Sequence, residues 1–219
     1  MLKERMDFLR GPGGLRAASY FGLKLITRIE AFRVLWMSAQ LNTALTLPSG
    51  WRYLSLYTAE ALCGLSSDVV EQVAEQCGSN PQQLLEHGGT LHLLLSGDSL
   101  VAQLRIDRGS NCRIDSPALY LTMAEADAFL SYLYTWPSYR RQGAARYLIA
   151  ATVDDLSQRG THRVLAHVRA TNVPSLAAFE HAGWQTCATI LCTLSGRLLM
   201  APGAASARLS IRAAESVGG

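Results

Sequence analysis

The sequence predicts a mixed α/β fold with a central sheet flanked by helices. Two stretches, 129–159 and 163–183, each read as a strand followed by a helix, and residues 90–107 read as a β-hairpin. A chain of 219 residues is long enough for one well-buried core with some appendage, and too short for two full domains. We therefore expect one principal domain over 46–200, an N-terminal appendage over 1–45 and a disordered tail over 201–219.

Composition narrows the class of protein. Hydrophobic residues make up 49% of the chain and charged residues 17%. The chain nevertheless contains no run of about 18 uncharged apolar residues, which is the length that a membrane-spanning helix needs. The first ten residues mix acids with bases and lead into no secretion signal, which predicts a cytoplasmic protein. The five cysteines show neither C-x-x-C spacing nor histidines at metal-ligand intervals, so we expect reduced thiols and no metal.

Positive charge is concentrated near the N-terminus. Residues 1–40 hold seven Lys or Arg and three acidic residues, a surplus of four, which leaves about −1 of the net +3 for the rest of the chain. The remainder lacks a basic face interleaved with stacking aromatics, so nucleic acid is not expected as a partner.

Residues 15–41 carry an apolar stripe at helical spacing and predict an N-terminal helix. Two interpretations stay open: the helix packs on the domain or on a second subunit as a homodimer contact, or it rests on an anionic membrane surface as a peripheral contact. The stripe consists of Phe21, Leu25, Ile29, Phe32 and Trp36.

The domain opens with a strand over 51–57 after a turn-rich boundary. Two short helices follow, the first capped by Ser66 or Ser67 and the second starting at Pro81 behind Asn80. The 90–107 hairpin turns at Gly97. Residues 108–126 form an insertion with an extra strand over 118–122, which either shapes a binding pocket or is an ordinary surface loop.

The most informative stretch joins the strand over 129–136 to the helix that runs to about Arg159. Pro137 ends ladder pairing because it has no N–H, and apolar residues at Ala145, Ile149, Val153 and Leu156 mark one helix face. The first N–H groups of a helix carry partial positive charge and suit a pyrophosphate, although a basic turn without a ligand is the plain alternative. The turn itself consists of Arg140, Arg141, Gln142, Gly143, Ala144 and Ala145.

A second strand, 163–169, leads into a helix that Asn172 and Pro174 open and Gly183 ends. Because two parallel strands joined by a helix form a crossover, we expect the 129–136 and 163–169 strands to be parallel neighbours. Residues 184–194 and 197–200 then make a terminal hairpin.

These two blocks together resemble the GNAT superfamily of acyl-CoA-dependent N-acyltransferases. Arg140, Gly143 and Ala145 match the family's R/Q-x-x-G-x-G/A turn, and the run A-H-V-R-A-T-N over 166–172 is similar to ribosomal-protein N-terminal acetyltransferases. The resemblance covers 129–184 and extends more weakly to 51. A later block matches at Asn172, Ser175, Phe179, Gly183 and Trp184.

The resemblance implies a twisted, mixed but mostly antiparallel sheet of about seven strands flanked by helices. The apolar stripe over 15–41 adds an extra N-terminal helix to this fold. The resemblance also implies acetyl-CoA or another acyl-CoA as co-substrate and transfer of the acyl group to a primary amine acceptor by direct attack. The pyrophosphate would lie on the 140–145 turn, and the pantetheine beside Asn172, Ser175 and Phe179. Backbone N–H groups of Leu133, Tyr134 and Thr135 would face the thioester oxygen.

His167 is the first candidate for the base, because it lies five residues before Asn172, where the similar enzymes carry a catalytic glutamate. An imidazole with a pKa near ~6.5 can relay a proton at neutral pH. An ordinary strand histidine is the alternative, and Glu125 and Asp127 are the next candidates for the base.

The acid is the main departure from the family pattern, because Phe179 stands where the family usually places a tyrosine. Water or another group would then protonate the thiolate; the side chains considered are Tyr134, Tyr139, Cys187 and His181. A catalytically weak acyl-CoA-binding or regulatory module stays open as an alternative, as does a nucleotide-binding module that uses the same turn.

Overall fold

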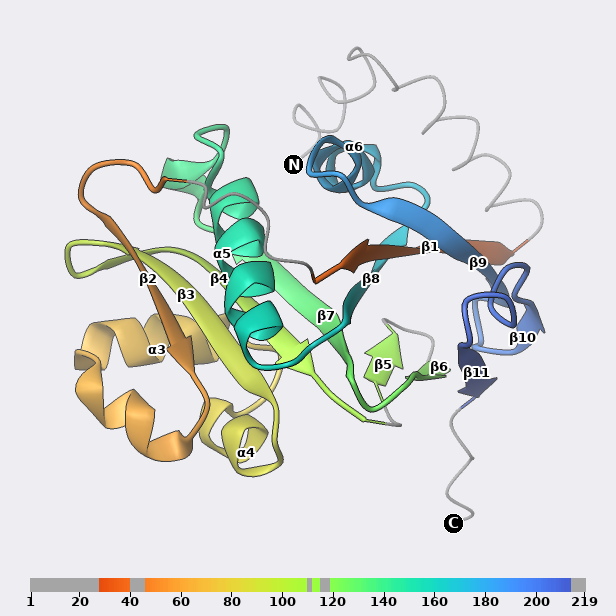
Figure 1. Cartoon of the computed structure of the whole chain (residues 1–219), viewed down its shortest axis with the longest axis horizontal. Helices are drawn as coiled ribbons and strands as arrows, with labels where there is room; N and C mark the ends of the chain where they lie inside the picture. The colour runs from red at the N-terminus through yellow and green to blue at the C-terminus, as the bar shows by residue number, and fades with distance from the viewer. Residues whose placement is uncertain (1–27, 40–45, 110–111, 115–118, 214–219) are drawn as a thin grey trace. The chain divides into compact units, whose positions relative to one another are not determined.

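The computed structural model describes residues 28–39, 46–109, 112–114 and 119–213. Residue contacts divide the chain into two compact units (Figure 1). The larger unit comprises Met37–Cys112 and Met123–Ala166, and the smaller comprises Met1–Trp36, Arg113–Thr122 and His167–Gly219. Each unit is described by itself.

The larger unit is built on antiparallel strands in the order β2, β3, β4, β7. β8 then runs parallel to β7, which confirms the expected parallel pair; its ladder joins Asp127–Leu130 to Arg163–Ala166. The strands are β2 (Trp51–Leu56), β3 (Thr90–Ser96), β4 (Ser99–Asp107), β7 (Asp127–Thr135) and β8 (Arg163–Arg169).

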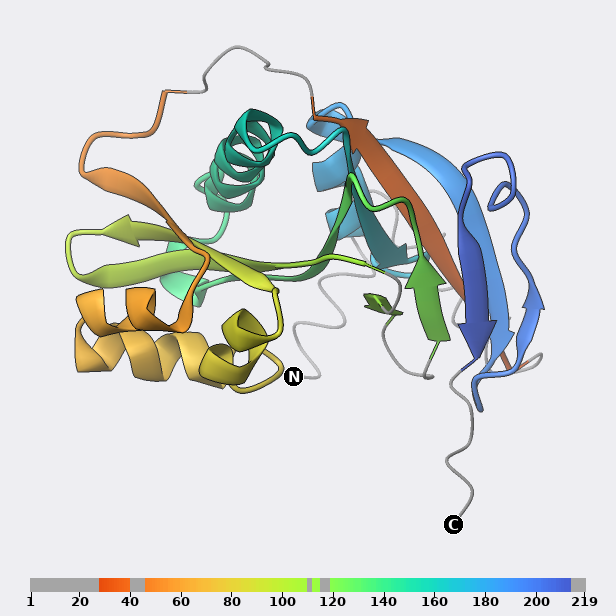
Figure 2. The same ribbon diagram turned by 60° about the horizontal axis from the view of Figure 1, so that its bottom comes forward.

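Helices cover both faces of this sheet, with α5 (Ala144–Gln158) on one face and α3 (Ser67–Glu75) and α4 (Pro81–Glu86) on the other (Figure 2). Both faces being covered explains why β3 is apolar without alternation, since Leu91, Leu93, Leu94 and Leu95 are all fully buried. A 3₁₀ turn, η1 (Ala59–Gly64), precedes α3.

The predicted helix starts are confirmed. The Ser66 hydroxyl accepts from the Val69 N–H at 3.4 Å, and Asn80 Oδ1 accepts from the Gln83 N–H at 3.1 Å, with Pro81 in the first turn. On α5, the expected residues Ile149, Val153 and Leu156 are buried, whereas Ala145 is only half-buried and its neighbour Ala144 is buried instead.

The smaller unit pairs β1 (Ile29–Ser38) with β9 (Gln185–Thr193), which also pairs with β10 (Leu198–Met200), all antiparallel. β11 (Ser210–Ala213) pairs with β6 (Leu119–Thr122), and β5 (Cys112–Ile114) lies beside β6. The helix of this unit is α6 (Val173–His181). The mixed, mostly antiparallel α/β fold class and the extra strand over 119–122 are confirmed.

The predicted N-terminal helix is wrong over 29–38, which form strand β1. Phe32, Val34 and Leu35 are fully buried and Ala31 nearly so, so apolar residues point to both faces. A strand buried on both faces has no alternation, and its apolar residues can then fall at helical spacing by chance. The rest of the predicted helix, 15–27 and 40–41, lies outside the described residues.

The predicted disordered tail is wrong over 201–213. The Thr189 N–H of β9 donates to Pro202 O at 3.0 Å, and Ser210–Ala213 form β11. Gly203, at φ +87°, permits this contact, because an added Cβ would lie 2.3 Å from Cys187 O. Residues 214–219 lie outside the described part of the chain.

No helix in the described ranges combines the length and the apolar composition that a membrane span requires.

Candidate functional site

The end of β7 departs from regular pairing. Tyr132 pairs with Arg105 and Leu130 with Ile106, so Ser131 is the extra residue of a β-bulge. Beyond Leu130, β7 has ladder partners only on β4 within the described chain. The bulge therefore coincides with the end of the β7–β8 ladder.

Backbone direction along this half of β7 follows from one contact. The Trp136 N–H donates to Val101 O at 3.0 Å, and in an antiparallel ladder alternate residues direct both backbone groups to the same neighbour. The backbone N–H and C=O of Tyr134 therefore point to β4, while the N–H groups of Leu133 and Thr135 point away from it. Two such N–H groups on one strand can donate to a developing oxyanion.

Aromatic side chains line the end of β7. The rings of Tyr134 and Trp136 meet edge to face with centroids 4.9 Å apart, and Trp136 packs against the apolar cluster beneath α3 and α4. The Arg140 guanidinium lies 5.9 Å from the centre of the Tyr134 ring. Tyr134 is half-buried in this group.

The turn after β7 is held by its own side chains. Arg140 Nε donates to Thr135 O at 3.2 Å, and Gln142 Nε2 donates to Ser138 O at 2.9 Å. A guanidinium has five N–H donors, so this bond leaves exposed Arg140 with others for an anion. Arg141 is exposed and adopts a left-handed backbone, φ +62°.

Gly143 caps α5 in a left-handed conformation, φ +79°, and no side chain caps the helix. The first intrahelical bond runs from the Tyr147 N–H to Gly143 O at 3.0 Å, so the N–H groups of Ala144, Ala145 and Arg146 have no intrahelical acceptor. The first turn of α5 holds no acidic residue. This N-terminus fits a phosphate group by charge and by geometry.

No local sequence pattern predicts the aromatic contacts that Trp51 makes around this turn. Trp51, on the edge strand β2, meets Tyr139 and Tyr147 edge to face, at centroid distances of 6.3 and 5.9 Å. Tyr147 is also the residue that an added Cβ at Gly143 would meet, 3.3 Å from a ring carbon. The start of α5 is thus packed against β2.

The candidate bases lie in different surroundings. His167, on the smaller unit's part of β8, is half-buried, and its ring centroid lies 5.9 Å from that of Phe32. Glu125 is exposed. Asp127 is buried and accepts from Arg163 at 3.2 and 2.5 Å, a bidentate ion pair at the start of β7. At about 3.3 Å per residue, Asp127 is ~20 Å from Leu133, so the structure does not bring it to the turn.

In the smaller unit, Asn172 Oδ1 accepts from the Ser175 N–H at 3.3 Å and caps α6. Phe179 is buried and meets Trp184 edge to face at 4.9 Å. The phenyl ring therefore belongs to the apolar interior of this unit.

The other candidate acids each have a contact of their own. His181 Nδ1 lies 2.6 Å from Ala177 O, and Cys187 Sγ donates to Val34 O at 3.5 Å. Tyr139 is engaged with Trp51. Among the described residues, no three His, Cys, Asp or Glu side chains are grouped to hold a metal ion.

The larger unit thus places a glycine-capped, acid-free helix N-terminus directly after a strand with two outward N–H donors. The model of the acetyltransferase (GNAT) family matches residues 55–184, more than half of the chain. The chain belongs to this family. A sequence comparison with curated proteins gives no match.

Several solved structures that resemble this chain are described as GNAT or GCN5-related acetyltransferases. One, described as an acetyltransferase from the GNAT family of Novosphingobium aromaticivorans, is 16% identical with a TM-score of 0.52, over 75% of this chain and 63% of that chain. A GCN5-related N-acetyltransferase from Sphaerobacter thermophilus is 15% identical with a TM-score of 0.51, over 78% and 54%. A ribosomal-protein alanine N-acetyltransferase from Escherichia coli is 18% identical with a TM-score of 0.42, over 61% and 76%. The chain thus spans less than two thirds of the first two.

Proposed function

We propose that this protein is an acyl-CoA-dependent N-acyltransferase that moves an acetyl or other acyl group from the CoA thioester to a primary amine by direct attack. The observation that carries this proposal is the Gly143-capped, acid-free N-terminus of α5, directly after a strand whose Leu133 and Thr135 N–H groups face away from β4. The N-terminus of α5, which we call the anion seat, can bind the pyrophosphate of acyl-CoA. The N–H donors on the preceding strand can bind its thioester carbonyl.

Acyl-CoA, when bound, supplies the activated acyl carbonyl and a thiolate leaving group. The N–H groups at 144–146 and the Arg140 guanidinium would hold the pyrophosphate. Leu133 and Thr135 would donate to the carbonyl oxygen as negative charge develops there. His167 would remove the proton that the amine must lose, and solvent would protonate the departing thiolate, since Phe179 has no proton to give.

Replacing Gly143 with glutamate should abolish CoA binding while the fold is kept. The new side chain forces φ +79° on a non-glycine residue, meets Tyr147 and places a carboxylate at the anion seat. We expect the Kd for CoA, measured by calorimetry, to rise about 100-fold or more, about 3 kcal/mol.

Gly160→Glu is the matched control. Gly160 has φ +80° just beyond the other end of α5, with no atom within 4 Å of an added Cβ, so it carries the same backbone strain without the anion seat. Equal CoA affinity in wild type and Gly143→Glu would contradict the assignment of this turn as the pyrophosphate site. Binding of ATP as tight as that of CoA would favour the nucleotide-binding alternative.

Replacing His167 with alanine should lower turnover by about 10²-fold or more without weakening CoA binding, because a positioned base contributes 10²- to 10⁴-fold. His167→Glu should retain part of the activity, because the resembling enzymes use a carboxylate there. A thiol-release assay over a panel of amines and acyl chain lengths measures both variants and also identifies the acceptor.

His162→Ala serves as the control, since His162 is an exposed histidine just before β8. Normal turnover in His167→Ala would show that His167 is not the base. CoA binding without turnover on any amine would favour the catalytically weak binding module.

A further inference from the structure

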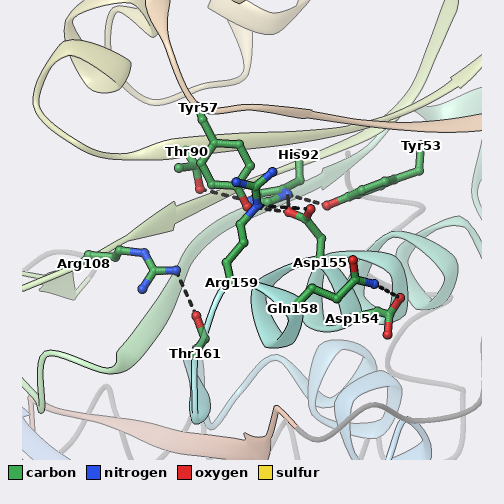
Figure 3. Close-up of polar contacts among 10 residues, drawn as sticks. All are labelled: Tyr53, Tyr57, Thr90, His92, Arg108, Asp154, Asp155, Gln158, Arg159 and Thr161. Atoms are coloured by element: carbon green, nitrogen blue, oxygen red, sulfur yellow. Dashed lines mark hydrogen bonds and ion pairs between the residues drawn. The ribbon is translucent and has the colours of Figure 1, made fainter.

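A group of titratable side chains that the proposed chemistry does not use lies between the C-terminal half of α5 and strands β2 and β3 (Figure 3). Its members come from three elements of the larger unit and are joined by hydrogen bonds and ion pairs. We call it the α5 network; it consists of Tyr53, Tyr57, Thr90, His92, Asp155 and Arg159.

His92 is the buried centre of the α5 network, with no exposed surface. Its Nδ1 lies 2.6 Å from the Tyr53 hydroxyl and its Nε2 lies 3.0 Å from Thr90 Oγ1, so one ring nitrogen donates and the other accepts. The Tyr53 ring also stacks on the imidazole at 6.0 Å. The two Tyr53 contacts join β2 to β3.

Asp155 connects α5 to these strands. Its Oδ2 accepts a hydrogen bond from the Tyr57 hydroxyl and lies 3.9 Å from His92 Nδ1, and its Oδ1 accepts from Arg159 Nε at 3.3 Å. The Arg159 guanidinium also lies 3.8 Å from the centre of the Tyr57 ring. Asp155 and Arg159 thus hold Tyr57 from two sides.

The phenols stay protonated and able to donate at neutral pH. Burial raises the pKa of Tyr57, and its hydrogen bond to Asp155 and that group's charge raise it further. Burial and the charge of Asp155 likewise raise the pKa of Tyr53. The Tyr57–Asp155 contact is therefore a charge-assisted hydrogen bond, which is strong and directional.

Directional contacts matter here because most of the other buried side chains of α5 are apolar, Thr152 being the polar exception. Leu148, Ile149, Val153 and Leu156 are buried against the sheet, and apolar contacts have no preferred direction. Replacing a partly buried ion pair by apolar side chains is often neutral or stabilising, so such a pair is weak evidence for a contribution to stability. A role in positioning the helix on the sheet explains its presence better. A bonded carboxylate fixes both the axial position and the rotation of its helix.

We propose that Asp155, bonded to Tyr57, is a positioning residue for acyl-CoA: it sets the place of α5 on the sheet and thereby aims the N–H groups at 144–146. This proposal rests on the proposed function. At 1.5 Å per residue, Asp155 is about 16 Å along the axis from Ala144, and a straight helix transmits an axial shift undiminished. Trp51 and Tyr147 pack the near end, and the α5 network fixes the far end.

The test is the double variant Tyr57→Phe, Asp155→Leu, which replaces the hydrogen bond with apolar groups of similar size. We expect its melting temperature to stay within a few degrees of wild type or to rise, while the Kd for CoA rises about tenfold. The single variant Asp155→Asn keeps an oxygen acceptor for Tyr57 and should retain most of the wild-type affinity for CoA.

Asp154→Leu is the control on the same helix, because Asp154 bonds only Gln158 of α5 in Figure 3, at 3.1 Å, and its loss should leave the Kd unchanged. Unchanged CoA affinity in the double variant would overturn the proposal, as would a loss of affinity matched by an equal loss of stability.

Amide exchange at Tyr147 and Leu148 without ligand gives an independent measure: faster exchange in the double variant than in Asp154→Leu supports the proposal, and equal exchange contradicts it. Wild-type protein that binds no CoA would contradict the proposed function, and this exchange measurement would still decide the role of Asp155 in placing α5.

Discussion

Phe32→Ala should destabilise the protein by about 3–5 kcal/mol, the cost of emptying a fully buried phenylalanine site. Phe32 lies at the middle of β1, opposite Ile190 of β9, with no exposed surface. Its ring also lies 5.9 Å from the His167 ring and from the Arg169 guanidinium. Urea unfolding of the intact chain measures the loss of free energy.

Arg33→Ala is the control for Phe32, because Arg33 is exposed on the same strand and its guanidinium donates to Thr189 Oγ1 at 2.8 Å. We expect it to cost less than about 1 kcal/mol.

The same reasoning predicts that deletion of residues 1–45 removes a core strand rather than an appendage, so the shortened chain should not fold. A soluble, folded deletion variant, or a Phe32→Ala protein as stable as wild type, would contradict the place of β1 in the core.

The second large effect is a loss of stability at acid pH that depends on His92. Burial lowers the pKa of His92 to about 4, against about 6.5 for an unburied histidine. Asp155 opposes the shift by raising this pKa, and the charges of Arg159 and Arg108 add to it. Between these two values the unfolded chain binds the proton and the folded chain does not.

Stability therefore falls as the pH drops from about 6.5 to about 4, by roughly 3 kcal/mol from this group. His92→Gln should remove that part of the pH dependence, and His162→Gln, at an exposed position, should keep it. Urea unfolding at pH 7 and pH 4.5 compares the three proteins. An equal pH dependence in all three would show that His92 is not buried as a neutral imidazole.

Local signals were sufficient for most elements of the larger unit. Asn80 before Pro81, Ser66 before the α3 sequence and Gly97 between two apolar runs act through their own backbone, so their effects can be read from a few neighbouring residues. The turn at 140–145 was recognisable for the same reason, since a helix N-terminus with a glycine cap is a local arrangement.

Non-local contacts were beyond such signals. The 29–38 stretch is a strand because β9, some 150 residues later, supplies its hydrogen bonds, and 210–213 is a strand because β6 does. The α5 network was missed for the same reason: Tyr53, His92 and Asp155 lie far apart in the chain, and each alone is an ordinary strand or helix residue.

The sequence by itself determined the class of fold, the parallel pair around α5, and the glycine-capped turn that places the chain with the GNAT acetyltransferases, because these depend on periodicity, capping and short motifs. Only the tertiary structure decided that 29–38 is a core strand, that Pro202 bonds to β9, that Asp127 is bound by Arg163, and that Asp155 is bonded to Tyr57. The physical reason is that burial and hydrogen-bond partners are properties of pairs of distant residues, and a pattern along one segment carries no information about its partner.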